Sequence, residues 1–247
     1  PTMGSLHRGH ISLIKNSKKQ CKKTIVSIFV NPTQFNDNND FKKYPRNLKL
    51  DIRILKKLKV NFLFIPNASE IYRNKNKNYK LHNNDKILCA KHRKGHFEGV
   101  LNIMNRLLNI IKAKNIFMGE KDYQQLFLIR KYLTKKYKIK IINCITVRDK
   151  NKVALSTRNN LLSKKNYYKA SLISKFLLKF KKELNRNRNS SSVLIKQNIK
   201  KLENLYNIKI DYLEFRNEKN LKLFNLKVKC RLFIAYYLDK VRLIDNY

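Results

Sequence analysis

The stretch NIFMGEKDYQQLFLIRKYLTKKYKIKIINCITV, from Asn115 to Val147, decides the fold class. NIFMGE predicts a short strand that runs into a polar loop, Gln124–Tyr137 predicts a helix, and Lys140–Val147 predicts a second strand. Two strands joined by a helix are typical of a parallel pair, because parallel strands need a long crossover connection. The stretch therefore predicts a β-α-β unit within a parallel sheet.

The same alternation of helices and strands fills the chain before this unit. One apolar face predicts a helix between residues 9 and 23, and the β-rich run TIVSIFV predicts a strand from Thr24 to Val30. Asn47 is placed to cap a helix of leucines and isoleucines at helical spacing. Further elements are a strand over Val60–Pro66 and a helix over Val100–Ala113. We expect an α/β domain over residues 1–147, with a Rossmann-like parallel sheet and crossover helices.

The pattern changes after about Arg148. Lys164–Leu184 predicts an amphipathic helix, and a second helix ends near Leu205. The tail segments IKIDYLEFRN and KCRLFIAYYLDKVRLIDN alternate like antiparallel strands. We therefore expect a smaller α+β domain over residues 148–247. The polar segments Asn74–Asn84 and Asn185–Val193 predict an exposed loop and a break between helices.

The composition is strongly basic. The net charge is +41, from 57 Lys and Arg residues against 16 Asp and Glu residues. Such a charge can indicate binding to nucleic-acid phosphates. The lysines are spread over the whole chain, however, and no RNA-binding aromatic motif accompanies them, which favours a compositional bias toward Lys, Asn and Ile. We expect non-specific attraction to polyanions but no specific nucleic-acid partner.

The spacing of the cysteines and the hydropathy of the chain indicate in which cellular compartment the protein lies. Cys21, Cys89, Cys144 and Cys230 are widely separated and form no CxxC pair, which argues against a zinc finger or a disulfide framework. No apolar run approaches the roughly 20 residues of a membrane span, and we read no signal peptide. We expect a cytoplasmic protein without a membrane partner. Because the sequence begins at Pro1, we also expect residues upstream of it.

The first polar motif is HRGH, which holds His7 and His10. At the start of a helix the two imidazoles would lie on one side of its N-terminal end, where free N–H groups favour anions. Imidazoles there can donate to phosphate oxygens and stabilise charge that develops on phosphorus. Two surface histidines are an equally good interpretation of this motif alone, and no third metal ligand lies nearby in the sequence.

Polar turns also follow two predicted strands. VNPTQF places Asn31 and Gln34 after one strand, and GEKDYQQL follows the other with Lys121 and Asp122 in its turn. Open α/β sheets bind ligands at the carboxyl ends of their strands. Each turn alone fits an ordinary Asn-Pro turn or a capping turn, but together with HRGH they form a candidate site.

Two further segments suit anions. ALSTRN places Ser156, Thr157 and Arg158 together, which suits a polyphosphate, although either hydroxyl could simply cap a helix. CAKHRKGHF places Arg93 near His96, as an anion-binding loop or as basic surface.

These motifs resemble one family. PTMGSLHRGH, SIFVNPTQF, YPR, RKGHFEGV, GEKDYQQL, TVRD, ALSTRN and KVRLIDN occur in the order typical of pantoate–β-alanine ligases (pantothenate synthetases), over nearly the whole chain. That family belongs to the nucleotidylyltransferase superfamily. In it a strand precedes the PTMG motif, so the resemblance adds to the expectation of upstream residues. Two departures are Arg8, where an acidic residue is common, and Lys94, where proline is usual.

The resemblance implies a two-step reaction. The pantoate carboxylate attacks the α-phosphate of ATP and gives pantoyl adenylate and pyrophosphate. The amine of β-alanine then attacks the acyl group and gives pantothenate and AMP, on the route to coenzyme A. The resemblance also implies Mg²⁺, a homodimer, and closure of the domain at 148–247 as a lid over the reactive intermediate.

The resemblance assigns the site residues as well. It implies catalytic roles for His10 as proton donor and for His7, Lys121 and Arg158. The residues implied in ATP binding are Met3, Gly4, His7, His10, Gly119, Glu120, Lys121, Asp122, Val147, Leu155, Ser156, Thr157 and Arg158. Those implied in binding pantoate and β-alanine are Asn31, Gln34 and Gln125, with Arg93, His96 and Tyr44 near the site and Asp51 as a magnesium ligand.

Other interpretations stay open on the sequence alone. Another adenylyl-transferring enzyme of this fold would share the HxGH motif, but it would not account for the glutamines or for GEKDYQQL. A basic nucleic-acid-binding protein or an inactive relative is a more distant alternative.

Overall fold

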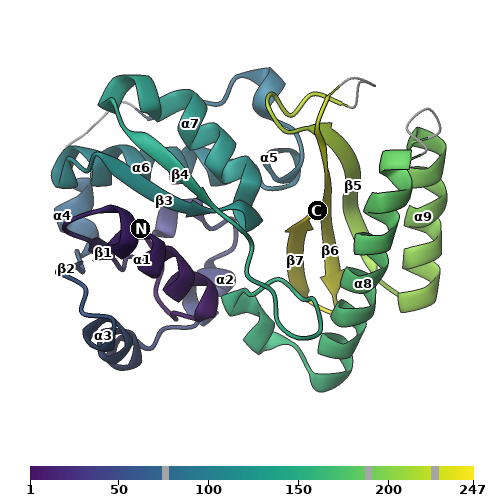
Figure 1. The fold of residues 1–247 in the computed structure, drawn as a ribbon, viewed down its shortest axis with the longest axis horizontal. Coiled ribbons are helices and arrows are strands. Elements are labelled where there is room, and N and C mark those ends of the chain that lie inside the picture. Colours follow the sequence, from purple (N-terminus) through teal and green to yellow (C-terminus); the bar gives the residue numbers. More distant parts are fainter. Residues whose placement is uncertain (74–77, 187–190, 224–227) are drawn as a thin grey trace. The chain divides into compact units, whose positions relative to one another are not determined.

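The chain folds into two compact units. The computed structural model describes residues 1–73, 78–186, 191–223 and 228–247, and these divide into Pro1–Val147, the first unit, and Arg148–Tyr247, the second unit (Figure 1). The predicted loop and the predicted polar break lie partly outside the described residues, at 74–77 and 187–190. No helix in the described ranges is long and apolar enough to cross a membrane.

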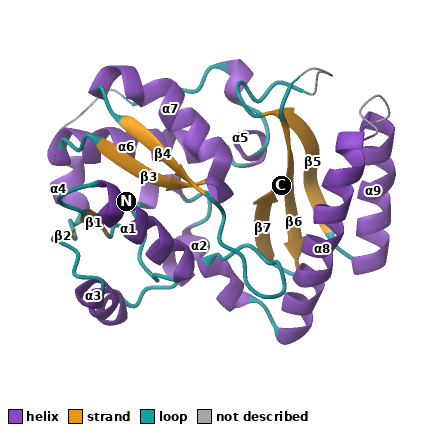
Figure 2. Cartoon of the chain, in the orientation of Figure 1, coloured by secondary structure: helices purple, strands orange, loops and turns teal. Residues whose placement is uncertain are grey.

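The first unit alternates helices and strands (Figure 2). Its elements in chain order are α1 (Arg8–Gln20), β1 (Ile25–Ser27), η1 (Pro32–Gln34), α2 (Asn38–Lys43), α3 (Leu48–Lys57), β2 (Phe62–Phe64), α4 (Ala68–Tyr72), η2 (Asn83–Asp85), α5 (Cys89–His92), α6 (His96–Ile111), β3 (Asn115–Gly119), η3 (Glu120–Asp122), α7 (Tyr123–Tyr137) and β4 (Lys140–Cys144).

The strands of the first unit pair in parallel, as predicted. β1 pairs with β2, with Val26 opposite Leu63, and β3 pairs with β4, with Phe117 opposite Ile142. The strands are shorter than the sequence predicts. Beyond β1, for example, the N–H of Ile28 still donates to the carbonyl of Phe64 at 2.9 Å. Ile28 also forms an isolated parallel bridge with Thr2, where the N–H of Phe29 donates to the carbonyl of Thr2 at 3.0 Å.

The two strand pairs form separate two-stranded sheets within the described residues. A groove of about 680 Å³ is lined by both, with Ile25 and Val26 of β1 and Ile116 and Phe117 of β3 on its walls. The strand expected before Pro1 lies outside the sequence and stays a prediction.

The helices of the first unit follow local sequence rules. The side chain of Asn47 accepts a hydrogen bond from the N–H of Leu50 at 3.1 Å, which confirms it as the cap of α3. α6 begins at His96, four residues before the predicted start. Gly95 precedes it at φ +81°, a conformation that glycine adopts without strain. Short helices such as α2, α4 and α5 carry too little periodicity to be predicted.

The second unit is an antiparallel sheet with helices, as predicted. Its elements are η4 (Thr157–Leu161), α8 (Lys164–Arg186), α9 (Ser191–Tyr206), β5 (Lys209–Asn217), β6 (Cys230–Leu238) and β7 (Val241–Asn246), with the strand order β5-β6-β7. α9 contacts β5 and α8 contacts β6. Leu238 pairs with Val241, so the hairpin turns through Asp239 and Lys240, and Asp239 takes the positive φ that such a tight turn needs.

A buried ion pair sits beside the core of the second unit. The guanidinium of Arg148 donates to both carboxylate oxygens of Asp245, at 2.7 and 2.8 Å, and lies over the ring of Tyr247 at 4.5 Å. The Arg148 and Asp245 side chains are 18% and 7% exposed. Burial first, and the Asp245 charge second, raise the pKa of Tyr247 well above its usual value. The pair therefore fixes the start of this unit to its last strand.

We expect Arg148→Met to lower the free energy of unfolding of the second unit by about 3–5 kcal/mol, because it leaves a buried carboxylate without its cation. Lys229→Met is the matched control. It removes the cation of the Lys229–Glu218 pair, but that lysine is 83% exposed, and a change of about 1 kcal/mol or less follows. Urea unfolding measures both. Equal losses in the two variants would contradict the assignment.

Candidate active site

The HRGH motif forms the N-terminal cap of α1. The Nδ1 atom of His7 accepts a hydrogen bond from the N–H of Gly9 at 3.1 Å, and the N–H of His7 donates to Nδ1 of His10 at 3.3 Å. A backbone N–H can only donate, so both Nδ1 atoms are acceptors. In the neutral rings, the proton is therefore on Nε2. The two ring centroids lie 4.1 Å apart, and the motif presents two Nε2–H donors at a helix N-terminus.

The environment keeps these imidazoles uncharged. Burial first, and the neighbouring His7 second, lower the pKa of His10 to about 3, although the carboxylate of Asp122 acts in the opposite direction. Burial and the Lys121 ammonium lower the pKa of His7. Desolvation disfavours the charged form of a base. At neutral pH, His10 therefore acts as a hydrogen-bond donor without a positive charge.

The GEKDYQQL turn supplies the full charges. η3 follows β3 directly, and its Lys121 ammonium lies 3.2 Å from the carboxylate of Asp122. Lys121 and Asp122 are close enough to both histidines to shift their pKa values. The HRGH motif and the GEKDYQQL turn, which are far apart in the sequence, therefore lie close together in the first unit.

The VNPTQF turn is held from several sides. Asn31 is 1% exposed, and its Nδ2 atom donates to the carbonyl of Gly99 and to Oε1 of Gln34, each at 3.2 Å. Its Oδ1 atom accepts from the hydroxyl of Tyr72 at 2.5 Å. The amide of Gln34 lies 3.0 Å from the sulfur of Met3. The turn after β1 therefore contacts the segment that leads to the histidines.

His96 and Arg93 act on the backbone of this turn. Nδ1 of His96 lies 2.7 Å from the carbonyl oxygen of Gln34, which can only accept, so Nδ1 carries the proton. The Nε2 atom then accepts from the guanidinium of Arg93 at 2.9 Å. The two side chains orient Gln34 through its carbonyl.

Gly99 lets α6 approach the same turn. A Cβ atom at Gly99 would lie 2.2 Å from the carbonyl oxygen of Thr33 and 2.9 Å from the nitrogen of Gln34. The sequence patterns assign no role to Gly99 or to the Tyr72 hydroxyl. A glycine within an apolar helix of a chain with 5 glycines was the available signal, since such a glycine usually has a packing reason. No local signal marks Tyr72.

Three further predicted site residues of the first unit are Gln125, Val147 and Tyr44. Gln125 is half-buried in the first turn of α7, whereas its neighbour Gln124 is buried and donates to the carbonyl of Ile87 at 2.7 Å. Val147 is the last residue of the unit. The ring of Tyr44 packs edge-on against the ring of Phe35, with centroids 5.5 Å apart. Phe35 directly follows Gln34 in the VNPTQF turn.

The predicted magnesium ligand has another role in the structure. Asp51 is 1% exposed, and its two carboxylate oxygens accept the N–H groups of Ser5 and Leu6 at 2.8 and 2.7 Å. Within the described ranges, no group of three or more His, Cys, Asp or Glu residues could hold a metal ion. Asp51 therefore does not fit a metal ligand in this structure.

The ALSTRN segment belongs to the second unit. The hydroxyl of Ser156 accepts from the N–H of Arg158 at 3.3 Å and caps η4, as the simpler interpretation of this motif predicts. Thr157 is buried, and Leu155 and Arg158 are half-buried.

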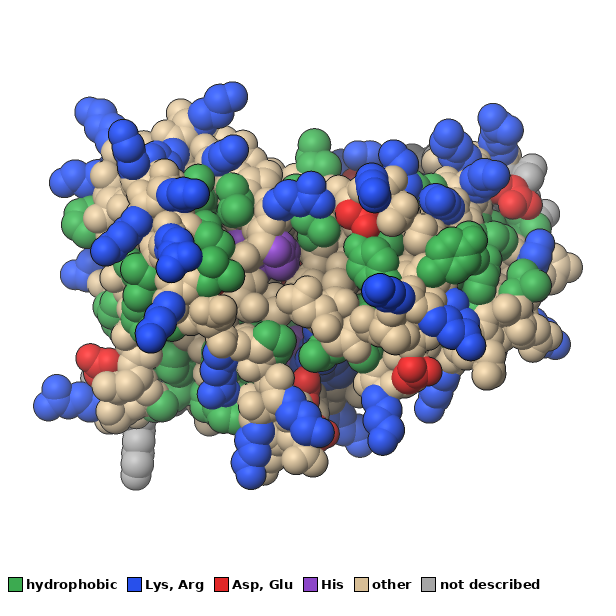
Figure 3. Space-filling model, turned by 90° about the horizontal axis from the view of Figure 1, so that it is seen from below, with side chains coloured by type: hydrophobic (Ala, Val, Ile, Leu, Met, Phe, Trp, Pro, Cys, Tyr) green, Lys and Arg blue, Asp and Glu red, His purple; other side chains and the backbone are tan. Residues whose placement is uncertain are grey.

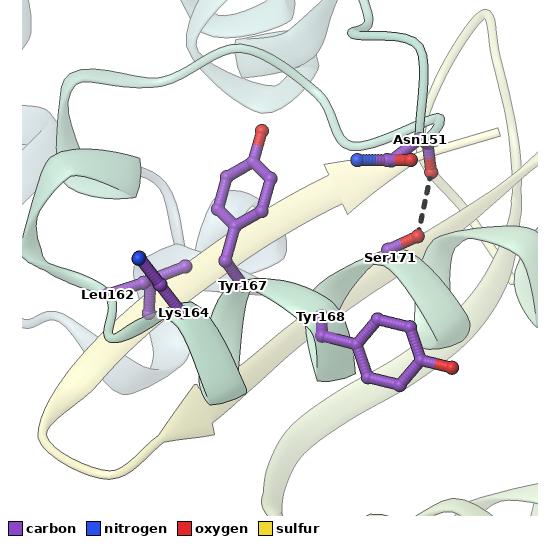
Figure 4. A pocket seen from close by; sticks show the side chains of 6 residues that line it. All are labelled: Asn151, Leu162, Lys164, Tyr167, Tyr168 and Ser171. Carbon is purple, nitrogen blue, oxygen red and sulfur yellow. Dashed lines mark hydrogen bonds between the residues drawn. The ribbon is translucent and has the colours of Figure 1, made fainter.

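A separate pocket of about 340 Å³ opens at the start of α8 (Figure 4). Lys164, Tyr167 and Tyr168 line it, and Ser171 donates to the carbonyl of Asn151 at 3.2 Å. No predicted site residue lines this pocket.

The surface shows no single basic patch on the face in view. Figure 3 shows Lys and Arg side chains scattered over that face. This distribution fits the compositional interpretation of the net charge of +41. All four cysteines are free thiols.

Comparisons with known proteins agree with the motifs. The family model described as pantoate-beta-alanine ligase matches residues 1–247. The pantothenate synthetase of Leptospira interrogans is 41% identical, over 100% of this chain and 88% of that protein. That of Campylobacter hominis is 40% identical, over 100% of this chain and 90% of that protein.

Solved structures resemble the fold over its whole length. A pantothenate synthetase from Thermus thermophilus matches with a TM-score of 0.90 at 29% identity, covering 100% of this chain and 91% of that one. The pantoate-beta-alanine ligase from Francisella tularensis, complexed with beta-gamma ATP and beta-alanine, matches with a TM-score of 0.84 at 40% identity, covering 100% and 87%.

We expect the ring of His10 to stay neutral in the folded protein. Its pKa of about 3 lies below the ordinary value of 6.5, so the unfolded chain binds more protons between these two pH values. This group's contribution to the free energy of unfolding therefore falls as the pH falls through that window. Histidine NMR from about pH 5 to 8 should show no titration of His10 and a proton on Nε2, while the urea-unfolded chain titrates normally. Titration of the folded ring near 6.5 would refute the assignment.

We expect Gly99→Ala to lower the free energy of unfolding by about 1–3 kcal/mol, because the new methyl group would push the backbone at Thr33. In a helix without that contact, alanine would stabilise by about 1 kcal/mol. Gly119→Ala is the control, since nothing lies within 4 Å of its Cβ position; we expect a change within about 0.5 kcal/mol. Urea unfolding compares the two, and a stabilised Gly99→Ala variant would count against the close contact.

Proposed function

The chain belongs to the pantoate–β-alanine ligase family, and on this premise we propose how its residues perform the reaction. The protein is an enzyme, a carbon–nitrogen ligase that condenses pantoate with β-alanine to pantothenate using ATP. The observation that carries the proposal is the cluster of His7, His10, Lys121 and Asp122 in the first unit. The amide of Gln34 contacts Met3, in the segment that leads to these histidines.

The first step transfers an adenylyl group. A carboxylate oxygen of pantoate forms a bond to the α-phosphorus, the bond from that phosphorus to the bridging oxygen breaks, and pyrophosphate leaves with the electron pair. The second step forms the amide. The amine of β-alanine attacks the acyl carbon, AMP leaves, and the nitrogen loses a proton.

The histidines stabilise the negative charge of the first step through the dipoles of their N–H groups. A carboxylate and a polyphosphate repel each other, so the first step needs donors placed where negative charge develops. Neutral His7 and His10 supply Nε2–H groups for phosphate oxygens. The proton-donor role of His10 is therefore a hydrogen bond from Nε2, since its low pKa leaves no imidazolium at neutral pH.

Lys121 provides the full positive charge. Its ammonium is a compact cation suited to phosphate, and Asp122 beside it is placed to accept from ribose hydroxyls. Met3, Gly4, Gly119, Glu120 and Val147 complete the proposed ATP contacts of this unit. In the second unit we assign Leu155, Ser156, Thr157 and Arg158 to the phosphates, supported by their basic and hydroxyl composition.

The amides hold the acid substrates without adding charge. Gln34 and Gln125 are assigned to pantoate, with Gln34 also serving β-alanine. Asn31 is buried and holds Gln34 by a hydrogen bond. The residues assigned to pantoate therefore belong to a hydrogen-bonded network, which His96 and Arg93 extend to the backbone of Gln34.

Several finer features belong to the same proposal. Magnesium bound with the nucleotide would supply further positive charge at the phosphates, which are the usual partners of this cation. Four free thiols support a reducing compartment, hence the cytoplasm. We assign the enzyme to a homodimer and its product to coenzyme A synthesis, on the strength of the family alone.

The test is ATP–pyrophosphate exchange combined with AMP release. We expect exchange that requires pantoate and AMP release that also requires β-alanine. Lys121→Ala should lower the rate of pyrophosphate release in a single turnover by at least about tenfold, through loss of one preorganised charge. Lys135→Ala, which removes an exposed lysine at the far end of α7, is the control and should keep the parent rate.

Pantoate-independent exchange would instead assign the chain to another adenylyl transferase of this fold. An unchanged rate in Lys121→Ala would remove that residue from the mechanism while leaving the overall reaction in place.

A further inference from the structure

A buried carboxylate on α3 ties down the turn that leads to the histidines. Asp51 lies in the first turn of α3 and is 1% exposed. Its Oδ2 atom accepts the N–H of Ser5 at 2.8 Å, and its Oδ1 atom accepts the N–H of Leu6 at 2.7 Å. The bonds join residues 46 and 45 positions apart in the chain, so they define the turn through tertiary structure.

The backbone of the turn is shaped for this carboxylate. Gly4 and Ser5 both have positive φ, at +79° and +52°, and successive N–H groups in such a turn converge on one anion. A Cβ atom at Gly4 would lie 3.0 Å from Oδ2 of Asp51 and 3.2 Å from Ile28. A side chain at this position would therefore press on the carboxylate and would be strained at this φ.

The turn connects directly to the chemistry. His7 follows Leu6, and its ring caps α1 while its N–H holds the ring of His10. Leu6 is buried in one cluster with Leu55 of α3. The carboxylate fixes the two N–H groups before His7, and the apolar contact fixes the same turn to the same helix.

We propose that Asp51 is a positioning residue for the adenylation step: its carboxylate holds the Ser5–Leu6 backbone and thereby places the Nε2–H groups of His7 and His10. The inference rests on the proposed function for its kinetic consequence, but its structural part stands alone. Two oxygens already bound by backbone amides at a position 1% exposed serve the turn and not a cation.

Asp51→Asn is the decisive substitution. It keeps the size of the side chain and one oxygen, but its NH₂ group then faces a backbone N–H, so one donor of the turn is left without an acceptor. A charge-assisted hydrogen bond contributes more than a neutral one, and loss of a buried acceptor leaves an unsatisfied donor. We expect amide hydrogen exchange at Ser5 and Leu6 to accelerate by at least about tenfold.

Asp85→Asn is the matched control. Asp85 is also buried in the first unit, at 4% exposure, but its carboxylate binds Lys131 and Tyr132. A merely structural role predicts the same behaviour for both variants. A positioning role predicts that Asp51→Asn alone raises the KM for ATP or lowers kcat by at least about tenfold, with the KM for pantoate changed less than about twofold.

Magnesium dependence separates the two roles of Asp51. If it positions the turn, the Mg²⁺ concentration for half-maximal activity stays within about twofold of the parent enzyme, and exchange at Ser5 and Leu6 accelerates equally without Mg²⁺. A large rise in the Mg²⁺ requirement, with the two amides still protected, would overturn the proposal and make Asp51 a metal ligand.

A second variant covers the case in which Asp51→Asn unfolds. Gly4→Ala presses on the same carboxylate from the other side and should reproduce the faster exchange at Ser5 and Leu6. Unchanged exchange in a folded variant of either kind would overturn the proposal. Exchange needs no substrate, so absence of pantoate-dependent activity in the parent protein would refute the proposed function without deciding the role of Asp51.

Discussion

The candidate site depends on one constraint: the buried backbone of its turns must be hydrogen-bonded. An unpaired N–H or C=O away from water costs free energy, and here side chains from distant elements supply the partners. Asp51 accepts two N–H groups before the histidines, and His96 donates to the carbonyl of Gln34. These bonds satisfy the turns and, at the same time, hold the residues to which we assign the reaction.

The same burial decides the charge of the site. Removal of water lowers the pKa of His10 far enough that the ring is neutral at physiological pH. In the proposed mechanism the histidines therefore contribute directed dipoles, while Lys121 contributes the cation. Lys and Arg residues are spread along the whole sequence, and Figure 3 shows them scattered over the face in view. In the proposed adenylation step the position of one ammonium matters more than the net charge of +41, because exposed charges are screened over about 10 Å.

Much of the fold could be predicted from periodicity. The long helices α3, α6, α7 and α8 and the parallel and antiparallel strands lie where hydrophobic patterns indicate. The strands are shorter than the sequence predicts, because a strand ends where its hydrogen-bonding partner strand ends. The local sequence of one strand does not show where its partner ends. α5 and α4 were missed because four or five residues hold too little periodicity. In the candidate site, the motifs predict Asn31 and Gln34, but the contacts of Tyr72 and Gly99 that support these two residues follow from no local pattern.

The sequence by itself determined the class of fold and the family, and it predicts the residue types for phosphate, because each of these follows from local patterns and from the order of motifs. Only the tertiary structure decided which N–H groups Asp51 accepts, which nitrogen of each histidine carries the proton, and why Gly99 has no side chain. Those answers depend on contacts between residues that are distant in the sequence, such as Asp51 and Ser5, which are 46 positions apart. Such contacts, and the burial that accompanies them, exist only in the folded chain.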